Sequence, residues 1–320
     1  MSQTEGGINA NSFPFSGSTP RMPDLPFPLP DSTRPVLIAG PTASGKSALA
    51  LRIATAQGRV IINADALQVH ACWSVLTARP PAEDLARAPH HLYGHVKRGA
   101  GYSVGHWLRE IGALLARHPD AVIVGGTGLY FSALTEGLAE IPPTPPEIRA
   151  RADRLLRKNG PQALLAGLDP QTAAQIDQQN PARLQRAWEV LQATGRGLAQ
   201  WQFETGPPLL PLDAVTALVL APARDWLNPR ITTRFAAMLQ GGALDEARAA
   251  LPHWPQDADR PSAPPWTRAI GAPELIAYLR GHISLAEAEA NATLATRQYA
   301  KRQRSWFRNR MKAWQRIELP

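Results

Sequence analysis

The chain has 320 residues, which is enough for one large domain together with a smaller one. Hydrophobic residues make up 44% of it, so a sizeable core can form and the chain as a whole is not disordered. The formal net charge of +8 favours a polyanionic partner, although the same charge also serves solubility. The single cysteine, Cys72, excludes a disulfide framework and a cysteine-based zinc site within one chain, and it favours a cytoplasmic location.

The N-terminal segment 1–33 is rich in Ser, Pro, Gly and Asn and has neither helical nor strand periodicity. We expect it to be a disordered leader, with Met22 as an alternative start. It lacks the basic and apolar regions of a signal peptide. The longest apolar stretch of the chain, 121–135, is too short to span a bilayer, so no membrane partner is expected.

Four short apolar runs have the length and composition of buried parallel strands. They lie at 35–40, 60–65, 121–125 and 215–221, and a helical pattern at 46–56 follows the first of them. Strands that alternate with helices predict an α/β fold, in which a parallel sheet is covered by helices on both faces.

The composition changes between the third and fourth strands. A proline cluster at 141–146 interrupts regular structure, and amphipathic helices are predicted at 147–158 and 181–194. We therefore expect a helical insertion at 140–210, with the core of the fold divided between 34–139 and 211–320.

The C-terminal stretch 285–314 is predicted to form one or two long basic helices. Five of its basic residues are three or four positions apart and would form one stripe on a helix: Arg297, Lys301, Arg304, Arg308 and Lys312. Such a stripe is either a solvated face or a ridge that binds phosphates.

Residues 40–47, GPTASGKS, fit the phosphate-loop pattern G-x-x-x-x-G-K-[ST] in full, with a strand before and a helix after. Glycines let the backbone N–H groups close on phosphate oxygens, and the helix N-terminus favours an anion. Lys46 supplies a positive charge, and the Ser47 hydroxyl can bind Mg²⁺. The fold predicted is thus a P-loop NTPase-like sheet, and a glycine-rich turn without function is the weaker interpretation.

The motif does not identify the molecule that carries the phosphates. The third strand and its loop, 121–128, contain no acid to hold Mg²⁺, and neither D-x-x-G nor N-K-x-D occurs. We therefore do not expect ordinary ATP or GTP hydrolysis. Asp65 ends the second strand at the edge that faces the ligand crevice, where it is either a general base or a helix N-cap.

Together these motifs resemble those of the tRNA dimethylallyltransferase family, over about residues 35–310. In chain order they are 40–47 (GPTASGKS), 65–69 (DALQV), 77–80 (TARP), 89–90 (PH), 102–103 (YS), 125–130 (GGTGLY), 180–187 (NPARLQRA), 268–271 (RAIG) and 295–303 (ATRQYAKRQ). The chain departs from the family pattern at Ala66, at His70, at Ala272 and over 71–76.

The resemblance implies transfer of a dimethylallyl group from dimethylallyl diphosphate to N6 of adenosine 37 in tRNA, next to the anticodon. It makes the phosphate loop the site of a diphosphate leaving group, with Mg²⁺ at Ser47, which explains the missing acid. The diphosphate site is expected to consist of Gly40, Thr42, Ala43, Ser44, Gly45, Lys46 and Ser47. The catalytic residues implied are Asp65, as general base, with Thr127 and Lys46.

The resemblance also implies that the insertion 140–210 binds the anticodon stem-loop and that a flipped adenine lies near Gln68. The tRNA-binding residues expected are Asp65, Ala66, Leu67, Gln68, Thr127, Arg149, Arg183, Leu184, Gln185, Arg186, Arg268 and Gly271. We expect the protein to act as a monomer.

Three other functions fit parts of the sequence. A small-molecule phosphotransferase would need an acidic Mg²⁺ partner that the sequence does not offer. An enzyme that prenylates free adenine nucleotides would not need the insertion or the basic C-terminal helix. An RNA-binding protein without activity would leave the phosphate loop unexplained. His90, His91 and His95 are interpreted as structural rather than metal-binding, and Trp188 and Trp201 as packing residues.

Overall fold

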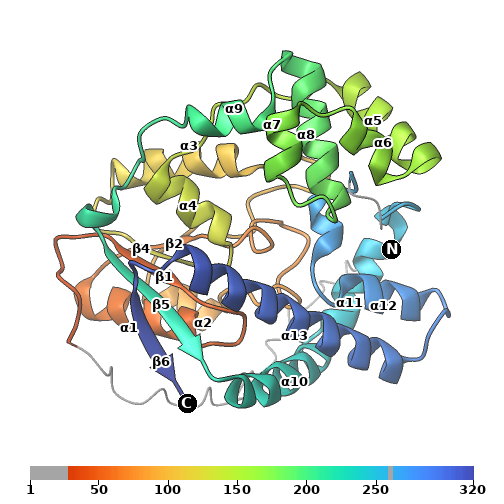
Figure 1. Ribbon diagram of the computed structural model, residues 1–320. Coiled ribbons are helices and arrows are strands. Elements are labelled where there is room, and N and C mark those ends of the chain that lie inside the picture. Colours follow the sequence, from red (N-terminus) through yellow and green to blue (C-terminus); the bar gives the residue numbers. More distant parts are fainter. Residues whose placement is uncertain (1–27, 259–261) are drawn as a thin grey trace, which may run out of the picture.

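The computed structural model describes residues 28–258 and 262–320 (Figure 1). Its centre is a six-stranded parallel sheet with the order β3-β2-β4-β1-β5-β6. The strands are β1 (Val36–Ala39), β2 (Ile61–Asn63), β3 (His90–His91), β4 (Val122–Gly125), β5 (Thr216–Pro222) and β6 (Gln315–Leu319). The predicted α/β fold with a parallel sheet and a helical insertion is confirmed.

Both faces of the sheet are buried, because alternate residues of β1, β2, β4 and β5 enter different cores. Val36 and Ile38 of β1 pack against α1 (Lys46–Gln57) on one face. Leu37 and Ala39 pack on the other face with α3 (Val104–Leu115) and α4 (Gly128–Glu136). A short helix, α2 (Ala82–Arg87), precedes β3.

A second layer of helices follows β5. It contains α10 (Arg224–Gln240), α11 (Ala243–Ala250), α12 (Ala272–Leu279) and the long α13 (Leu285–Arg310), with 3₁₀ turns at Leu251–His253 and Pro265–Arg268. A further 3₁₀ turn, Leu212–Ala214, precedes β5. Its apolar core includes Trp73 and Trp266, whose rings lie 6.2 Å apart. The helix α13 runs from this layer back to the sheet (Figure 1).

The insertion forms a helical group of its own at the edge of the molecule (Figure 1). Its helices are α5 (Pro146–Asn159), α6 (Pro161–Ala166), α7 (Pro170–Gln175), α8 (Pro181–Thr194) and α9 (Leu198–Phe203). Ala152, Leu164, Leu184 and Trp188 form a separate small core there, as the packing role of Trp188 predicts. The domain boundaries at 140 and 210 stay a prediction.

Two strands and the end of the last helix differ from the prediction. β3 has only two residues, and in β6 only Ile317 is buried, so neither strand has a readable alternation. The predicted helix over 285–314 ends at Arg310, and the chain then turns into β6. Lys312 therefore lies beyond the helix and is not part of the basic stripe.

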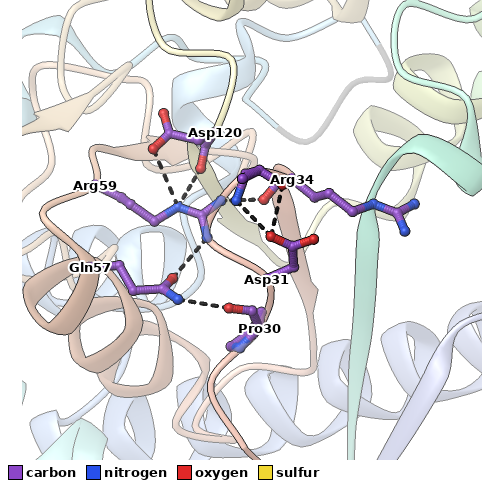
Figure 2. Close-up of polar contacts among 7 residues, drawn as sticks. Pro30, Asp31, Arg34, Gln57, Arg59 and Asp120 are labelled. Carbon is purple, nitrogen blue, oxygen red and sulfur yellow. Dashed lines mark hydrogen bonds and ion pairs between the residues drawn. The ribbon is translucent and has the colours of Figure 1, made fainter.

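The prediction of a disordered leader is wrong for its last residues and lies outside the described residues for 1–27. Figure 2 shows how the chain at Pro30 is held: the Gln57 amide donates to its carbonyl oxygen at 2.7 Å. The buried guanidinium of Arg59 donates to the carbonyl oxygens of Arg34 and Asp120 and to Gln57 Oε1. This network fixes the chain where it enters β1.

Candidate active site

The phosphate loop connects β1 to α1 and has the backbone that anion binding requires. Ala43 and Gly45 have φ values of 63° and 88°, left-handed values that curve the backbone of the loop. No side chain caps α1 at its N-terminus, and its first turn holds no acid. The N–H groups there are thus free to face a ligand. The Arg230 guanidinium braces the loop by donating to the Ala43 carbonyl oxygen at 3.1 Å.

The ammonium group of Lys46 is available to bind an anion. Its Nζ makes one long hydrogen bond, of 3.5 Å, to the carbonyl oxygen of Pro41. Burial lowers the pKa of its ammonium group to about 8; the carboxylate of Asp65 raises this pKa and the guanidinium of Arg234 lowers it. Lysine, aspartate and arginine therefore interact electrostatically across one site.

Asp65 is held firmly two residues after β2. The Asn63 side chain accepts from the Asp65 N–H at 2.9 Å and donates to the Asp65 carbonyl oxygen at 3.0 Å. The Leu67 N–H donates to Oδ1 of Asp65 at 3.0 Å. This turn fixes the carboxylate, which is 9% exposed and borders a cavity.

The loop after β4 touches the loop after β2, as their places at the carboxyl edge of the sheet predict. A Cβ at Gly125 would lie 2.0 Å from the Ala64 carbonyl oxygen, so only glycine fits there. Thr127 Oγ1 accepts from the Ala66 N–H at 2.9 Å. Asp65 and Thr127, predicted from separate motifs, thus lie side by side.

Gln303 of α13 joins this pair to the phosphate loop. Its Oε1 accepts from the Thr42 N–H, and its Nε2 donates to the Gly126 carbonyl oxygen, each at 2.9 Å. Gln303 belongs to the run 295–303 that carries the family resemblance, but no role was predicted for it. Tyr299, one turn earlier, interacts with Thr127, and burial together with the Asp65 carboxylate raises the pKa of its phenol.

The cavity at this junction is small, with a volume of about 70 Å³. Its polar lining consists of Thr42, Asp65, Thr77, Arg234, Thr296 and Tyr299, and its apolar lining of Leu67, Leu76, Ile231, Phe235, Met238 and Ile270. Arg234 was not predicted, because one arginine in an ordinary helix has no distinguishing motif.

Some of the residues predicted to contact tRNA belong to the core of the fold, where they form two groups. Leu67 lines the cavity, and Gln68 is tied by its amide to the carbonyl oxygens of Thr77 and Ala78. Gly271 has a φ of 93°, and a Cβ there would lie 2.7 Å from the Phe235 ring. A glycine is therefore needed at position 271, because a side chain there would clash with the wall of the cavity. Arg268, which shortly precedes it in the sequence, is exposed.

In the insertion, Arg149 and Arg183 are exposed, and half-buried Arg186 donates to Thr144 Oγ1 at 2.7 Å. Leu184 and Gln185 are 0% and 4% exposed. Leu184 packs in the core of the insertion, and the Gln185 amide donates to Asp153 and Glu189. Contacts of these two residues with tRNA stay a prediction, and their side chains are buried in this structure.

The histidines do not form a metal site within the part of the chain that the structure describes, where no three His, Cys, Asp or Glu side chains are grouped to hold an ion. His90 and His91 are in β3, and the His91 ring stacks on His118 at 5.6 Å. None of the described helices has both the length and the apolar character to cross a membrane.

The whole chain is similar to known proteins. The family model "IPP transferase" matches residues 68–310, and "Isopentenyl transferase" matches residues 34–93. A tRNA dimethylallyltransferase of Cereibacter sphaeroides (strain KD131) is 60% identical over 325 residues, with 100% of each chain covered. One from Dinoroseobacter shibae is 63% identical over 295 residues, which cover 90% of this chain and 97% of the relative.

Two solved structures are similar as well. The tRNA isopentenylpyrophosphate transferase of Bacillus halodurans is 28% identical with a TM-score of 0.61, covering 89% of this chain and 90% of that one. A eukaryotic dimethylallyltransferase acting on tRNA is 23% identical with a TM-score of 0.73, over 90% of this chain and 74% of that one, and shares the fold.

Proposed function

We propose a division of catalytic roles in this site, from the premise that the chain belongs to the IPP transferase family, the tRNA dimethylallyltransferases. The reaction attaches a dimethylallyl group to adenosine 37 of tRNA. The bond from the dimethylallyl carbon to the diphosphate oxygen breaks, the bond from this carbon to N6 of adenine forms, and N6 loses a proton. The proposal is carried by the meeting of Lys46, Asp65 and Thr127 in one site: the Asp65 carboxylate interacts electrostatically with Lys46, and Thr127 Oγ1 binds the N–H of the residue that follows Asp65.

The phosphate loop takes the diphosphate. Its curved backbone and the uncapped N-terminus of α1 suit an anion, and Lys46 supplies the charge that stabilises the leaving group as it departs. Arg234 adds a second cation on the cavity wall. Gly40, Thr42, Ser44 and Gly45 shape this loop around the ligand.

Mg²⁺ fits the loop as a partner of the substrate. The Ser47 hydroxyl is exposed at the start of α1, and magnesium usually takes few protein ligands together with substrate phosphate oxygens and water. When bound, the ion would neutralise part of the diphosphate charge. Ser47 is the residue of this chain that would hold it.

Asp65 receives the proton from N6. The Leu67 N–H binds Oδ1 and fixes the carboxylate at the cavity wall, so a base positioned there can act without rearrangement. Thr127, whose hydroxyl oxygen is held by the Ala66 N–H, lines the passage between the two substrates. A flipped adenine would lie near Gln68.

Affinity for dimethylallyl diphosphate should fall as pH rises above about 8, because burial lowers the pKa of Lys46 to about 8. A bound anion favours the charged ammonium, so the pKa of Lys46 is higher in the complex than in the free enzyme. Affinity is then full below the free pKa and falls about tenfold per pH unit above it. Titration calorimetry between pH of about 7 and 9.5 measures this. Equal affinity across that range would contradict it.

The tRNA is proposed to lie across the insertion and α13. Arg149, Arg183 and Arg186 offer positive charge on the insertion, and Arg297, Lys301, Arg304 and Arg308 on α13. Neutralising Arg304 and Arg308 should weaken tRNA binding and flatten its salt dependence by about one slope unit per lost phosphate contact. Affinity across a salt series measures this, and diphosphate binding should not change.

The matched control for that pair replaces Arg87 and Arg117, two exposed arginines outside α13, with the same change of charge. If the lines of affinity against salt coincide for the parent and the Arg304 and Arg308 variant, tRNA docks elsewhere.

One assay tests the function itself. The protein is incubated with labelled dimethylallyl diphosphate and Mg²⁺, and with either tRNA or AMP. Label in tRNA is the expected result, and label in AMP alone would contradict the proposal. We also propose a cytoplasmic location and a monomeric enzyme; light scattering of the free protein and of its tRNA complex checks the second of these.

A further inference from the structure

One carboxylate holds the loop that borders the cavity beside Asp65. Glu246, in the first turn of α11, accepts three hydrogen bonds from successive backbone N–H groups. The Ser74 and Val75 N–H groups donate to Oε1 at 2.7 and 2.8 Å, and the Leu76 N–H donates to Oε2 at 3.0 Å. Three charge-assisted bonds to one half-buried side chain make a strong anchor between segments about 170 positions apart in the sequence.

The anchored loop in turn holds Gln68. The Nε2 group of Gln68 donates to the Thr77 carbonyl oxygen at 3.0 Å and to the Ala78 carbonyl oxygen at 2.8 Å. Leu76 and Thr77 themselves line the cavity beside Asp65. The position of Gln68 therefore depends on the three residues that Glu246 fixes.

The backbone of this loop is strained, which makes an anchor necessary. Ala78 has a φ of 48°, a left-handed conformation that costs a non-glycine residue free energy. The Ala78 N–H donates to the Val75 carbonyl oxygen, and the Arg79 N–H to the Ser74 carbonyl oxygen, each at 2.9 Å. The strained turn is thus closed on two of the residues whose N–H groups Glu246 binds.

We propose that Glu246 is a positioning residue for prenyl transfer: it clamps residues 74–76 so that the Thr77 and Ala78 carbonyls hold Gln68 beside the acceptor base. This inference rests on the proposed function of the cavity. The clamp acts on the side of the cavity that receives the base and makes no hydrogen bond to the phosphate loop. Its loss should therefore lower the rate of transfer while leaving diphosphate binding unchanged.

Two variants grade the effect. Glu246→Ala removes all three acceptors, and we expect kcat on tRNA to fall about 10-fold to 100-fold, as misplacement at a distance from the reacting atoms does. Glu246→Gln keeps the oxygen that binds Ser74 and Val75 and loses the bond to Leu76, so a smaller loss of about 3-fold to 10-fold is expected. Asp245→Asn is the matched control, because Asp245 is exposed in the same turn and pairs with Arg248.

Hydrogen exchange of the peptide 73–79 measures, independently of activity, how firmly Glu246 holds the backbone of residues 74–76. Exchange should be fastest in Glu246→Ala, intermediate in Glu246→Gln and equal to the parent in Asp245→Asn, with the dissociation constant for dimethylallyl diphosphate the same in all four proteins. Faster exchange with an unchanged kcat would show that Glu246 only stabilises the fold and would overturn the proposal, as would unchanged exchange. A parent enzyme that does not prenylate tRNA would instead refute the proposed function, whatever the exchange pattern.

Discussion

Asp65→Asn is expected to lower the single-turnover rate of prenyl transfer by roughly 10²–10⁴-fold, the usual cost of losing a general base. The replacement keeps the shape of the side chain, and its amide oxygen can still accept from the Leu67 N–H that fixes Oδ1 in the parent. The turn after β2 should therefore survive, since Asn63 also braces it. What is lost is a group able to accept the N6 proton.

Rapid-quench measurement with saturating tRNA and diphosphate separates this step from binding. Affinity for tRNA should stay nearly unchanged. Asp213→Asn is the control, because Asp213 is exposed in the turn before β5. If the Asp65→Asn rate stays within about threefold of the parent, well below the range for a general base, Asp65 serves the structure alone.

Lys46→Ala is expected to weaken binding of dimethylallyl diphosphate by roughly 10²–10³-fold, the scale on which one partner of a desolvated charge pair is lost. Lys46 is the only positively charged side chain within residues 40–47. Its pKa is lowered because burial removes water from the charged ammonium group, and a bound anion would compensate for that loss.

Direct titration with the diphosphate measures the effect of Lys46→Ala, and Lys158→Ala serves as control because Lys158 is exposed at the end of α5. Folding of the Lys46 variant should not suffer, since the lysine makes one long hydrogen bond in the free protein. An unchanged dissociation constant would mean that the diphosphate binds outside the loop.

Strong local patterns made much of the fold predictable. The strands β1, β2, β4 and β5 are short apolar runs buried on both faces, and the phosphate loop has a spacing that only one backbone conformation satisfies. β3 and β6 carried too few buried residues to be recognised. The order of the strands in the sheet could not be predicted from the sequence either, although this order brings the ends of β2 and β4 together.

The site was predictable only where a motif carried it. Asp65 was predicted because it ends a strand at the carboxyl edge of the sheet, and Thr127 because it stands in the motif 125–130 that carries the family resemblance. Gln303 donates and accepts across the site from 261 positions beyond Thr42, and such a contact leaves no local pattern. Glu246 is likewise one of two acids in a short helix, and only the three N–H groups that face it distinguish it.

The insertion shows what a motif alone leaves open. Leu184 and Gln185 were assigned to tRNA because they stand in a family motif, whereas their positions on α8 face the interior of the insertion. Arg183, next to them, faces solvent. A motif places a segment near its partner, but helical geometry decides which of its side chains can reach that partner.

The most direct test of the central claim maps the label within tRNA. Two transcripts of one tRNA, with adenosine or guanosine at position 37, are incubated with the enzyme, Mg²⁺ and labelled dimethylallyl diphosphate, and their nucleosides are separated by mass spectrometry. A site built from Lys46, Asp65 and Thr127 for transfer to that adenosine predicts N6-dimethylallyladenosine in the first transcript and no label in the second. Equal labelling of both transcripts, or label on any other atom than N6, would contradict it.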